Sequence, residues 1–194
     1  MATSIVLVRH GETDWNRESR FQGHADPPLN ETGRAQARAL AANLGDVAFA
    51  AAYTSPLRRA RETAEVLGAT LGLTPVDDPA LMEVDVGSWS GLTRTEIEAR
   101  FPAGFARWLE GRHGWDDGET NDDLGARVVA GLLEIGARHP DAAVLAVTHG
   151  GPIRSALAAA DCIPFDGAHR SIHGIGNCTV VELAVRDGKL ERVD

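Results

Sequence analysis

Three short apolar runs, separated by longer helix-like segments, constrain the fold of this chain more than any other feature. Residues 5–8, 49–54 and 143–147 each have the length of a single strand. Continuous apolar runs are typical of strands that are buried on both faces, as in parallel sheets. A further segment, residues 177–185, alternates well enough to be a closing strand.

Helices are predicted between these strands from capping residues and apolar spacing. Asn30 is the predicted cap of one helix, and Ser55, which precedes a proline, is the predicted cap of another. Residues 124–135 repeat apolar side chains at helical spacing, and Pro152 is the predicted opening of a last helix. This alternation predicts a single α/β domain over residues 1–194, with three αβα layers around a mostly parallel central sheet.

The composition narrows the class of protein and the kinds of partner. A net charge of −9 argues against nucleic acid or an anionic membrane as the main partner, because the long-range field is repulsive. No segment resembles a signal peptide or reaches the ~20 apolar residues that span a bilayer. Cys162 and Cys178 have no metal-binding or redox spacing, and they fit reduced thiols in the cytoplasm.

Two histidines follow predicted strands in the same way. His10 comes after residues 5–8 and Arg9, His149 comes after residues 143–147 and a threonine, and glycine follows each histidine. Ligands of open α/β sheets bind beyond the carboxyl ends of the strands, so both imidazoles should face one crevice. Either histidine alone is equally well explained as a loop residue. The pair, with an arginine beside one member, indicates a functional site.

A third candidate segment, residues 55–59, follows the second predicted strand. An arginine in the first turn of a helix is mildly unfavourable unless it and the helix N-terminus jointly hold an anion. Arg58 and Arg59 point to different sides of the helix, so only one of them need face a pocket. Arg58 is interpreted as a solvated surface residue.

The candidate carboxylates are Glu12, Glu83 and Glu119. Glu83 lies among apolar residues, a setting that suits a general acid. The pattern alone does not separate Glu83 from Asp85.

Six segments carry a resemblance that spans nearly the whole chain. They read Arg-His-Gly-Glu-Thr-Asp-Trp-Asn at 9–16, Phe-Gln-Gly-His-Ala-Asp-Pro-Pro-Leu-Asn at 21–30, Thr-Ser-Pro-Leu-Arg-Arg-Ala at 54–60, Leu-Met-Glu with Gly-Ser-Trp in 81–89, Gly-Glu-Thr at 118–120 and Val-Thr-His-Gly-Gly at 147–151. Together they resemble the histidine phosphatase superfamily, the group of cofactor-dependent phosphoglycerate mutases. The resemblance implies a phosphoglycerate mutase-like fold. One departure is Ser90, where the family often has glutamate, and Glu119 is the alternative candidate for the acid.

The resemblance also implies a role for each matched residue. His10 becomes phosphohistidine, and Glu83 donates a proton to the leaving oxygen. The groups around the transferred phosphoryl are Arg9, Arg59 and His149. The remaining matched residues line the pocket or bind the substrate: Thr13, Asn16, Gln22, Gly23 and Gly150. No metal and no cofactor is implied, and the expected partner is a small phosphorylated metabolite; a homodimer is left open.

Three functional alternatives are weighed against a phosphatase. Mutases of the family carry a longer insertion between the acid segment and the second His-Gly step, which this chain lacks. A non-catalytic phosphate-binding module would have lost one of the catalytic residues, and all are present. A metal hydrolase is suggested by His169 and His173, which lie four residues apart, but the glycines that follow favour a loop and no third ligand is evident.

The substrate remains open, because it depends on a variable segment of about residues 92–120 that is expected to form a lid. Trp108 and Trp115 fit a substrate wall and a packed core equally well. His113 is a candidate for contact with the non-phosphate part of the substrate.

Overall fold

Strands and helices alternate along the chain in the computed structural model, which describes residues 2–193. The strands are β1 (Ala2–Arg9), β2 (Phe49–Thr54), β3 (Val76–Asp77), β4 (Ala143–Thr148), β5 (Val180–Arg186) and β6 (Lys189–Arg192). The α-helices are α1 (Asp14–Arg17), α2 (Glu31–Asn43), α3 (Arg58–Leu71), α4 (Arg94–Arg100), α5 (Pro102–Leu109), α6 (Asn121–Arg138), α7 (Gly150–Ala160) and α8 (Ala168–Ser171). Two short 3-10 turns, η1 (Pro79–Leu81) and η2 (Gly87–Trp89), lie between β3 and α4.

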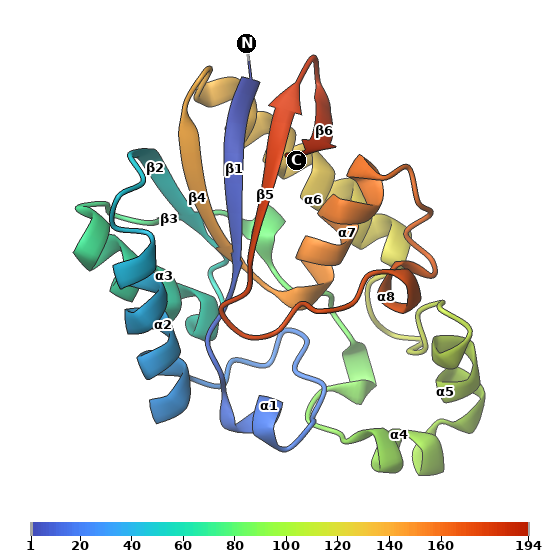
Figure 1. Ribbon diagram of the computed structural model, residues 1–194. Coiled ribbons are helices and arrows are strands. Elements are labelled where there is room, and N and C mark those ends of the chain that lie inside the picture. Colours follow the sequence, from blue (N-terminus) through green and yellow to red (C-terminus); the bar gives the residue numbers. More distant parts are fainter. Residues whose placement is uncertain (1, 194) are drawn as a thin grey trace.

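The six strands form one sheet in the order β3-β2-β4-β1-β5-β6 (Figure 1). The first four strands of the chain run parallel to one another, whereas β5 pairs antiparallel with β1 and β6 pairs antiparallel with β5. The predicted α/β architecture with a mostly parallel central sheet is therefore confirmed, and β5 overlaps the predicted closing strand but begins three residues later and ends one residue later.

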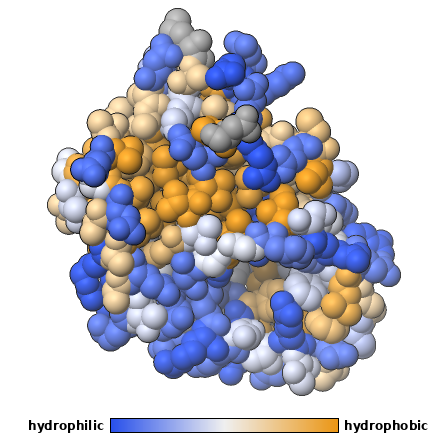
Figure 2. All heavy atoms as spheres, in the orientation of Figure 1, coloured by the Kyte–Doolittle hydropathy of each residue, from blue (hydrophilic) through white to orange (hydrophobic). Residues whose placement is uncertain are grey.

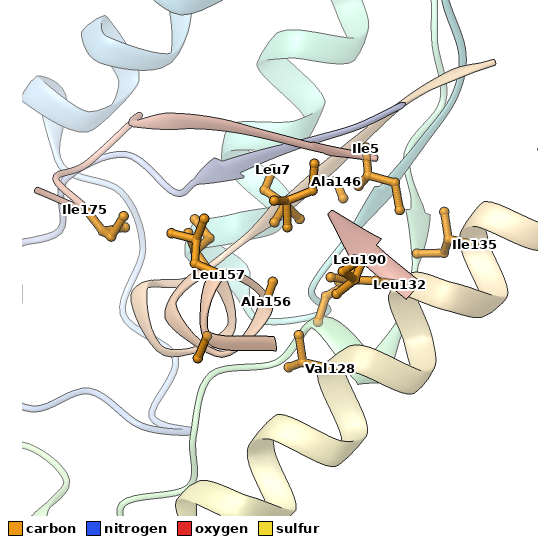
Figure 3. Close-up of a cluster of buried hydrophobic side chains, with 14 of the residues drawn as sticks. Ile5, Leu7, Val128, Leu132, Ile135, Ala146, Ala156, Leu157, Ile175 and Leu190 are labelled. Atoms are coloured by element: carbon orange, nitrogen blue, oxygen red, sulfur yellow. The ribbon is translucent and has the colours of Figure 1, made fainter. Parts of the chain in front are cut away.

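The central strands β1 and β4 are buried on both faces of the sheet, which explains their continuous apolar runs. Ile5 and Leu7 of β1 pack with α6 and α7 on one face, in the cluster that Figure 3 shows. Val6 and Val8 point the other way, into a second cluster with residues of α2 and α3. Because neighbouring residues of a strand face opposite sides, a strand covered by helices on both sides has no position left for a polar residue.

The predicted helix starts are confirmed at one position and wrong at two. Asn30 caps α2, because its side-chain oxygen accepts a hydrogen bond from the Gly33 amide at 2.8 Å. Ser55 does not cap α3, which begins at Arg58 without any side-chain cap. The Ser55 side chain instead contacts His149, which follows the carboxyl end of β4. Helix α7 begins at Gly150, so Pro152 lies inside its first turn.

The carboxyl ends of β1 and β4 meet at one edge of the sheet, the lower edge in Figure 1, where α1 and α4 lie. In the same orientation, Figure 2 shows mostly hydrophilic residues over this lower part and hydrophobic residues over the sheet. Among residues 2–193, no helix is both long and apolar enough to cross a membrane.

Candidate active site

The two His-Gly steps lie side by side at the carboxyl ends of β1 and β4. Arg9 pairs with Thr148 in the strand register, and the His10 amide donates a hydrogen bond to the Thr148 carbonyl at 3.0 Å. The centroids of the His10 and His149 rings are 5.1 Å apart. Both rings are buried, with 2% and 0% exposure. The parallel pairing of β1 and β4 thus unites residues that are far apart in the sequence.

The orientation of His10 leaves one ring nitrogen available for attack. Its Nδ1 lies 2.7 Å from the Gly11 carbonyl oxygen, so Nδ1 carries the proton and Nε2 keeps its lone pair. Burial, with Arg59 and Arg9 nearby, holds the pKa of His10 well below 6.5. The imidazole is therefore neutral at pH 7, as a nucleophile must be.

Gly11 allows this loop to pack closely against the start of α2. A Cβ atom at Gly11 would lie 2.5 Å from the Gly33 carbonyl oxygen. Any larger residue would push the loop, and His10 with it, away from the helix.

Ser55 determines which nitrogen of His149 carries the proton. The Ser55 hydroxyl lies 2.7 Å from His149 Nε2, and the Leu57 amide donates to the same hydroxyl oxygen at 3.3 Å. Since the Leu57 amide already donates to this oxygen, we assign the hydroxyl proton to the contact with Nε2, which places the ring proton on Nδ1. Burial, followed by the charge of Arg59, also holds the pKa of His149 well below 6.5. His149 is thus a neutral donor through Nδ1.

Three buried N–H groups in this region have no hydrogen-bond partner within residues 2–193: Nε of Arg9, Nε of Arg59 and Nδ1 of His149. Buried polar groups are almost always paired, so three unpaired donors in one region mark a place for a ligand with several acceptor oxygens. The arginines are held by backbone carbonyls. Arg9 donates to Ile175 at 2.7 Å, and Arg59 donates to Gly23 at 2.9 Å and to Ala25 at 2.8 Å.

Arg59 is the buried member of the arginine pair, with 1% exposure, whereas Arg58 is exposed and pairs with Glu62. Burial lowers the pKa of Arg59 to about 10, partly offset by the nearby carboxylate of Glu83. Arg59 is therefore still charged at pH 7. A buried, charged guanidinium beside neutral imidazoles suits a phosphate group.

Glu83 is the carboxylate among the residues that line the cavity around His10. Its Oε1 accepts hydrogen bonds from the amides of Val84 at 2.9 Å and Gly151 at 3.2 Å. A Cβ atom at Gly151 would lie 2.2 Å from the same oxygen, so a larger residue there would displace the Glu83 carboxylate. The other carboxylate candidates lie elsewhere: Asp85 accepts from the Gly87 amide, Glu119 is paired with Arg127, and Glu12 accepts from Asn30.

Three of the five predicted substrate-binding residues line the cavity: Asn16, Gln22 and Gly23. Thr13 does not. It is fully buried, and it caps α1 by exchanging hydrogen bonds with Asn16. Gly150 is also outside the lining, although a Cβ there would lie 3.1 Å from Arg154 Nη1 and 3.8 Å from Arg9 Nε. Thr13 therefore contacts Asn16 without lining the cavity itself, and Gly150 lies next to Arg154 and Arg9, also outside the lining.

The cavity extends well beyond these groups. Its volume is about 760 Å³, within the range of small-molecule sites. Trp108 and His169 form part of its outer wall; their rings stack with centroids 5.2 Å apart, and His173 also lines it. Trp115 lines it too, although it is 5% exposed and packs edge-on against Trp89. His113 is not among the lining residues.

His169 and His173 do not belong to a metal-binding group. Within residues 2–193, no three histidine, cysteine, aspartate or glutamate side chains are grouped so that they could hold a metal ion. His169 Nε2 lies 3.1 Å from the Trp108 carbonyl oxygen instead.

The sequence analysis gave two residues near the site, Arg154 and His24, no role, and it gave Ser55 a wrong one. Arg154 lines the cavity from α7, one turn after Gly150, a spacing that offered a usable signal. Ser55 has the wrong predicted role, since a serine before proline fits a helix cap equally well. His24 Nε2 lies 2.8 Å from the Glu83 carbonyl oxygen, a contact that no local pattern indicates.

Comparison with known proteins agrees with this geometry. The family described as Histidine phosphatase superfamily (branch 1) matches residues 5–193. The chain belongs to this family. It is 38% identical over 195 residues to a glucosyl-3-phosphoglycerate phosphatase of Mycobacterium tuberculosis, covering 94% of this chain and 86% of the relative. It is 35% identical over 153 residues to phosphoserine phosphatase 1 of Hydrogenobacter thermophilus, covering 78% of this chain and 72% of the relative.

A solved structure, Bacillus stearothermophilus YhfR, superposes with a TM-score of 0.90 at 35% identity, covering 98% of this chain and 95% of that one. The relatives named above are phosphatases, so the prediction of a phosphatase of this superfamily is confirmed over the mutase alternative. The chain is a phosphoric monoester hydrolase of the histidine phosphatase superfamily.

Proposed function

We propose that this histidine phosphatase hydrolyses phosphate monoesters of small metabolites through a phosphohistidine on Nε2 of His10. The observation that carries the proposal is the set of three unpaired buried donors beside a neutral His10 with a free Nε2. A phosphoryl group in transfer spreads negative charge over three oxygens, and donors already held in place stabilise it without reorganisation.

The first chemical step forms the bond between His10 Nε2 and phosphorus and breaks the bond between phosphorus and the ester oxygen. Arg9, Arg59 and Nδ1 of His149 donate to the equatorial oxygens. Protonated Glu83 donates its proton to the departing oxygen, so that a neutral alcohol leaves and Glu83 becomes a carboxylate.

The second step returns the enzyme to its starting state. The Glu83 carboxylate accepts a proton from water as the water oxygen attacks phosphorus. The bond between phosphorus and Nε2 breaks, phosphate is released, and His10 is again neutral. The amides of Val84 and Gly151 hold the carboxylate in place for both proton transfers.

Within this proposal the substrate-binding residues are Asn16, Gln22 and Gly23, while Thr13 and Gly150 support them from behind. The chain acts as one domain over residues 1–194, and the segment of about residues 92–120 selects the alcohol part of the substrate. The relatives' names suggest phosphoserine and glucosyl-3-phosphoglycerate as first substrates to try.

A cytoplasmic location and the exclusion of nucleic acid as a partner are part of the proposal. Two free cysteines support the first and the net charge of −9 supports the second. A homodimer is supported by hydrophobic residues on the face in Figure 2, and light scattering of the purified protein would test it.

The decisive test is to trap the intermediate. Rapid quenching in alkali after mixing with a ³²P-labelled monoester should yield labelled protein that loses its label in acid, as phosphohistidine does. His10→Ala should take up no label while keeping its circular dichroism spectrum. Equal labelling of the wild type and of His10→Ala would overturn the proposed role of His10.

A further inference from the structure

The segment that carries Glu83 is held by side chains rather than by a neighbouring strand. Residues 79–83 lie between β3 and η2 and belong to no strand of the sheet. A backbone carbonyl away from water needs a hydrogen-bond donor, and here the donors come from other elements. The carbonyls of Ala80 and Met82 accept from Arg127, each at 3.0 Å, that of Leu81 accepts from Thr148 at 2.6 Å, and that of Glu83 lies 2.8 Å from His24 Nε2.

Arg127 of α6 makes most of these contacts. In addition to the two carbonyls at 3.0 Å, its Nη1 lies 3.4 Å from the Pro79 carbonyl oxygen and its Nη2 lies 3.5 Å from that of Glu83. One planar guanidinium thus spans the whole segment, which the single nitrogen of a lysine could not do. The position of the Glu83 backbone therefore depends on where this guanidinium lies.

Close packing of α6 against the segment brings Arg127 within reach. Gly131 lies four residues further along the helix, on the same face as Arg127. A Cβ atom at Gly131 would lie 2.4 Å from the Cβ atom of Ala80. The glycine therefore allows α6 to approach η1, and the arginine then reaches the carbonyls beyond it.

Glu119 fixes the orientation of the Arg127 guanidinium. Its Oε1 accepts from Nε at 2.8 Å and its Oε2 accepts from Nη2 at 2.7 Å, which is a bidentate ion pair. Glu119 is itself held by its backbone, because its amide donates to the Asp85 carbonyl at 2.8 Å and its carbonyl accepts from Trp115 Nε1 at 2.7 Å. The two side chains are largely buried, with 17% exposure for Glu119 and 26% for Arg127.

Neither member of this ion pair is among the residues that line the cavity, so neither is placed to touch a substrate. Both act on the segment that leads to Glu83. The Glu83 carboxyl is in turn fixed by the amides of Val84 and Gly151, one on its own segment and one on α7. Its position relative to α7 is therefore kept only if residues 79–83 stay where Arg127 holds them.

We propose that Glu119 and Arg127 are positioning residues, which keep the Glu83 carboxyl within reach of the leaving oxygen. The inference rests on the proposed function and adds two residues that act through Glu83. Proton transfer requires the acid to lie within hydrogen-bond distance of the oxygen that it protonates. A small displacement of Glu83 would therefore slow the step that needs its proton, and it would leave phosphate binding intact.

Two aryl esters of similar shape test the proposal. Phenol leaves poorly without a proton, whereas p-nitrophenol leaves readily as an anion. In Arg127→Met, kcat/KM for phenyl phosphate should fall about tenfold to a hundredfold, as a displacement of about 1 Å at the acid would cause. For p-nitrophenyl phosphate, kcat/KM should fall less than about threefold, because the phosphate ligands stay in place.

Glu119→Gln should give the same pattern with a smaller loss. Glutamine keeps the size of the side chain and one acceptor oxygen, so this variant tests the ion pair in a folded chain even if Arg127→Met does not fold. Thermal melting of both variants checks their folding. The matched control is Arg138→Met on the same helix. Arg138 is exposed, pairs with Glu134 and is not a lining residue, so its variant should keep the wild-type ratio of the two kcat/KM values.

A double variant shows whether the ion pair acts through Glu83. Adding Arg127→Met to Glu83→Gln should cause less than about a threefold further loss for phenyl phosphate, because the carboxyl that Arg127 positions is already absent. A further loss as large as that of Arg127→Met alone would overturn the proposal. Equal losses for the two esters in the folded single variants would also overturn it, as would an unaltered kcat/KM for phenyl phosphate. Those results would leave the phosphatase intact, whereas absence of phosphate release from both esters in the wild type would refute the proposed function itself.

Discussion

The two ends of the cavity are built in different ways. The inner end is lined by His10 and Arg59, and the His149 ring lies beside His10 without lining the cavity. Each of these three side chains is buried and is held by a backbone carbonyl or by a buried hydroxyl. The outer end is formed by residues of short helices, such as Arg94 of α4 and Trp108 of α5, and its side chains are half-buried or exposed.

This difference in construction suggests a division of labour. Preorganised, buried donors are suited to chemistry that is the same for every monoester. Side chains on short connecting helices can change without disturbing the sheet, and they are suited to selecting the alcohol. We therefore expect changes at the inner end to affect all substrates alike and changes at the outer end to affect their ranking.

The largest effect should come from removing the nucleophile. His10→Ala should lower kcat at least about 10⁴-fold for every monoester, because no other group can form the covalent intermediate. A panel of monoesters, assayed for phosphate release, measures it. A variant that lost activity toward some substrates and kept it toward others would contradict the assignment of His10 to the inner end.

Glu83→Gln should come next and should depend on the leaving group. With alkyl esters, whose alcohols leave poorly without a proton, kcat should fall about 10²–10⁴-fold. With p-nitrophenyl phosphate, whose leaving group is stable as an anion, the loss should be at least about tenfold smaller. An equal loss on both kinds of ester would argue against Glu83 as the proton donor.

The neighbouring arginines of α3 offer a matched pair that sharpens the comparison. Arg59→Ala removes buried donors to the phosphoryl group and should lower kcat/KM about 10²–10³-fold on all esters. Arg58→Ala removes an exposed side chain that pairs with Glu62, and it should leave kcat/KM nearly unaltered. Comparable losses of kcat/KM in the two variants would contradict the proposal that the buried arginine, and not the exposed one, binds the phosphoryl group.

The smallest predicted effect is on stability and concerns pH. His10 and His149 have pKa values well below 6.5 in the folded chain, so below pH 6.5 only the unfolded chain binds these protons. Stability should therefore decline as the pH falls below about 6.5, by at most about 1.4 kcal/mol per pH unit for each histidine.

Urea denaturation at about pH 7.5 and about pH 5.0 measures this slope. The exposed His173 at the outer end supplies the control, since His173→Gln should leave the slope as it is. A His149→Gln variant, in contrast, should have a shallower slope. An unaltered slope in that variant would show that the buried imidazole of His149 contributes nothing to the acid sensitivity.

Much of the inner end was predictable from local patterns. Runs such as residues 143–147 indicate strands because burial on both faces excludes polar residues. The glycines after His10 and His149 mark strand ends where the backbone turns. The fold rules for parallel sheets then place both histidines at one edge, and the α/β fold follows from the alternation of strands and helices.

Tertiary structure alone decided which side chains face the cavity. Ser55 looks like a helix cap until the pairing of β2 with β4 brings it to His149. Glu83 and Asp85 are equivalent in their local pattern, and the resemblance alone favoured Glu83 until the approach of the α7 N-terminus distinguished the two carboxylates. Arg154 enters the site because α7 packs beside β1. Sequence patterns record periodicity and burial along one segment, whereas the distance between segments depends on how the helices and strands pack together.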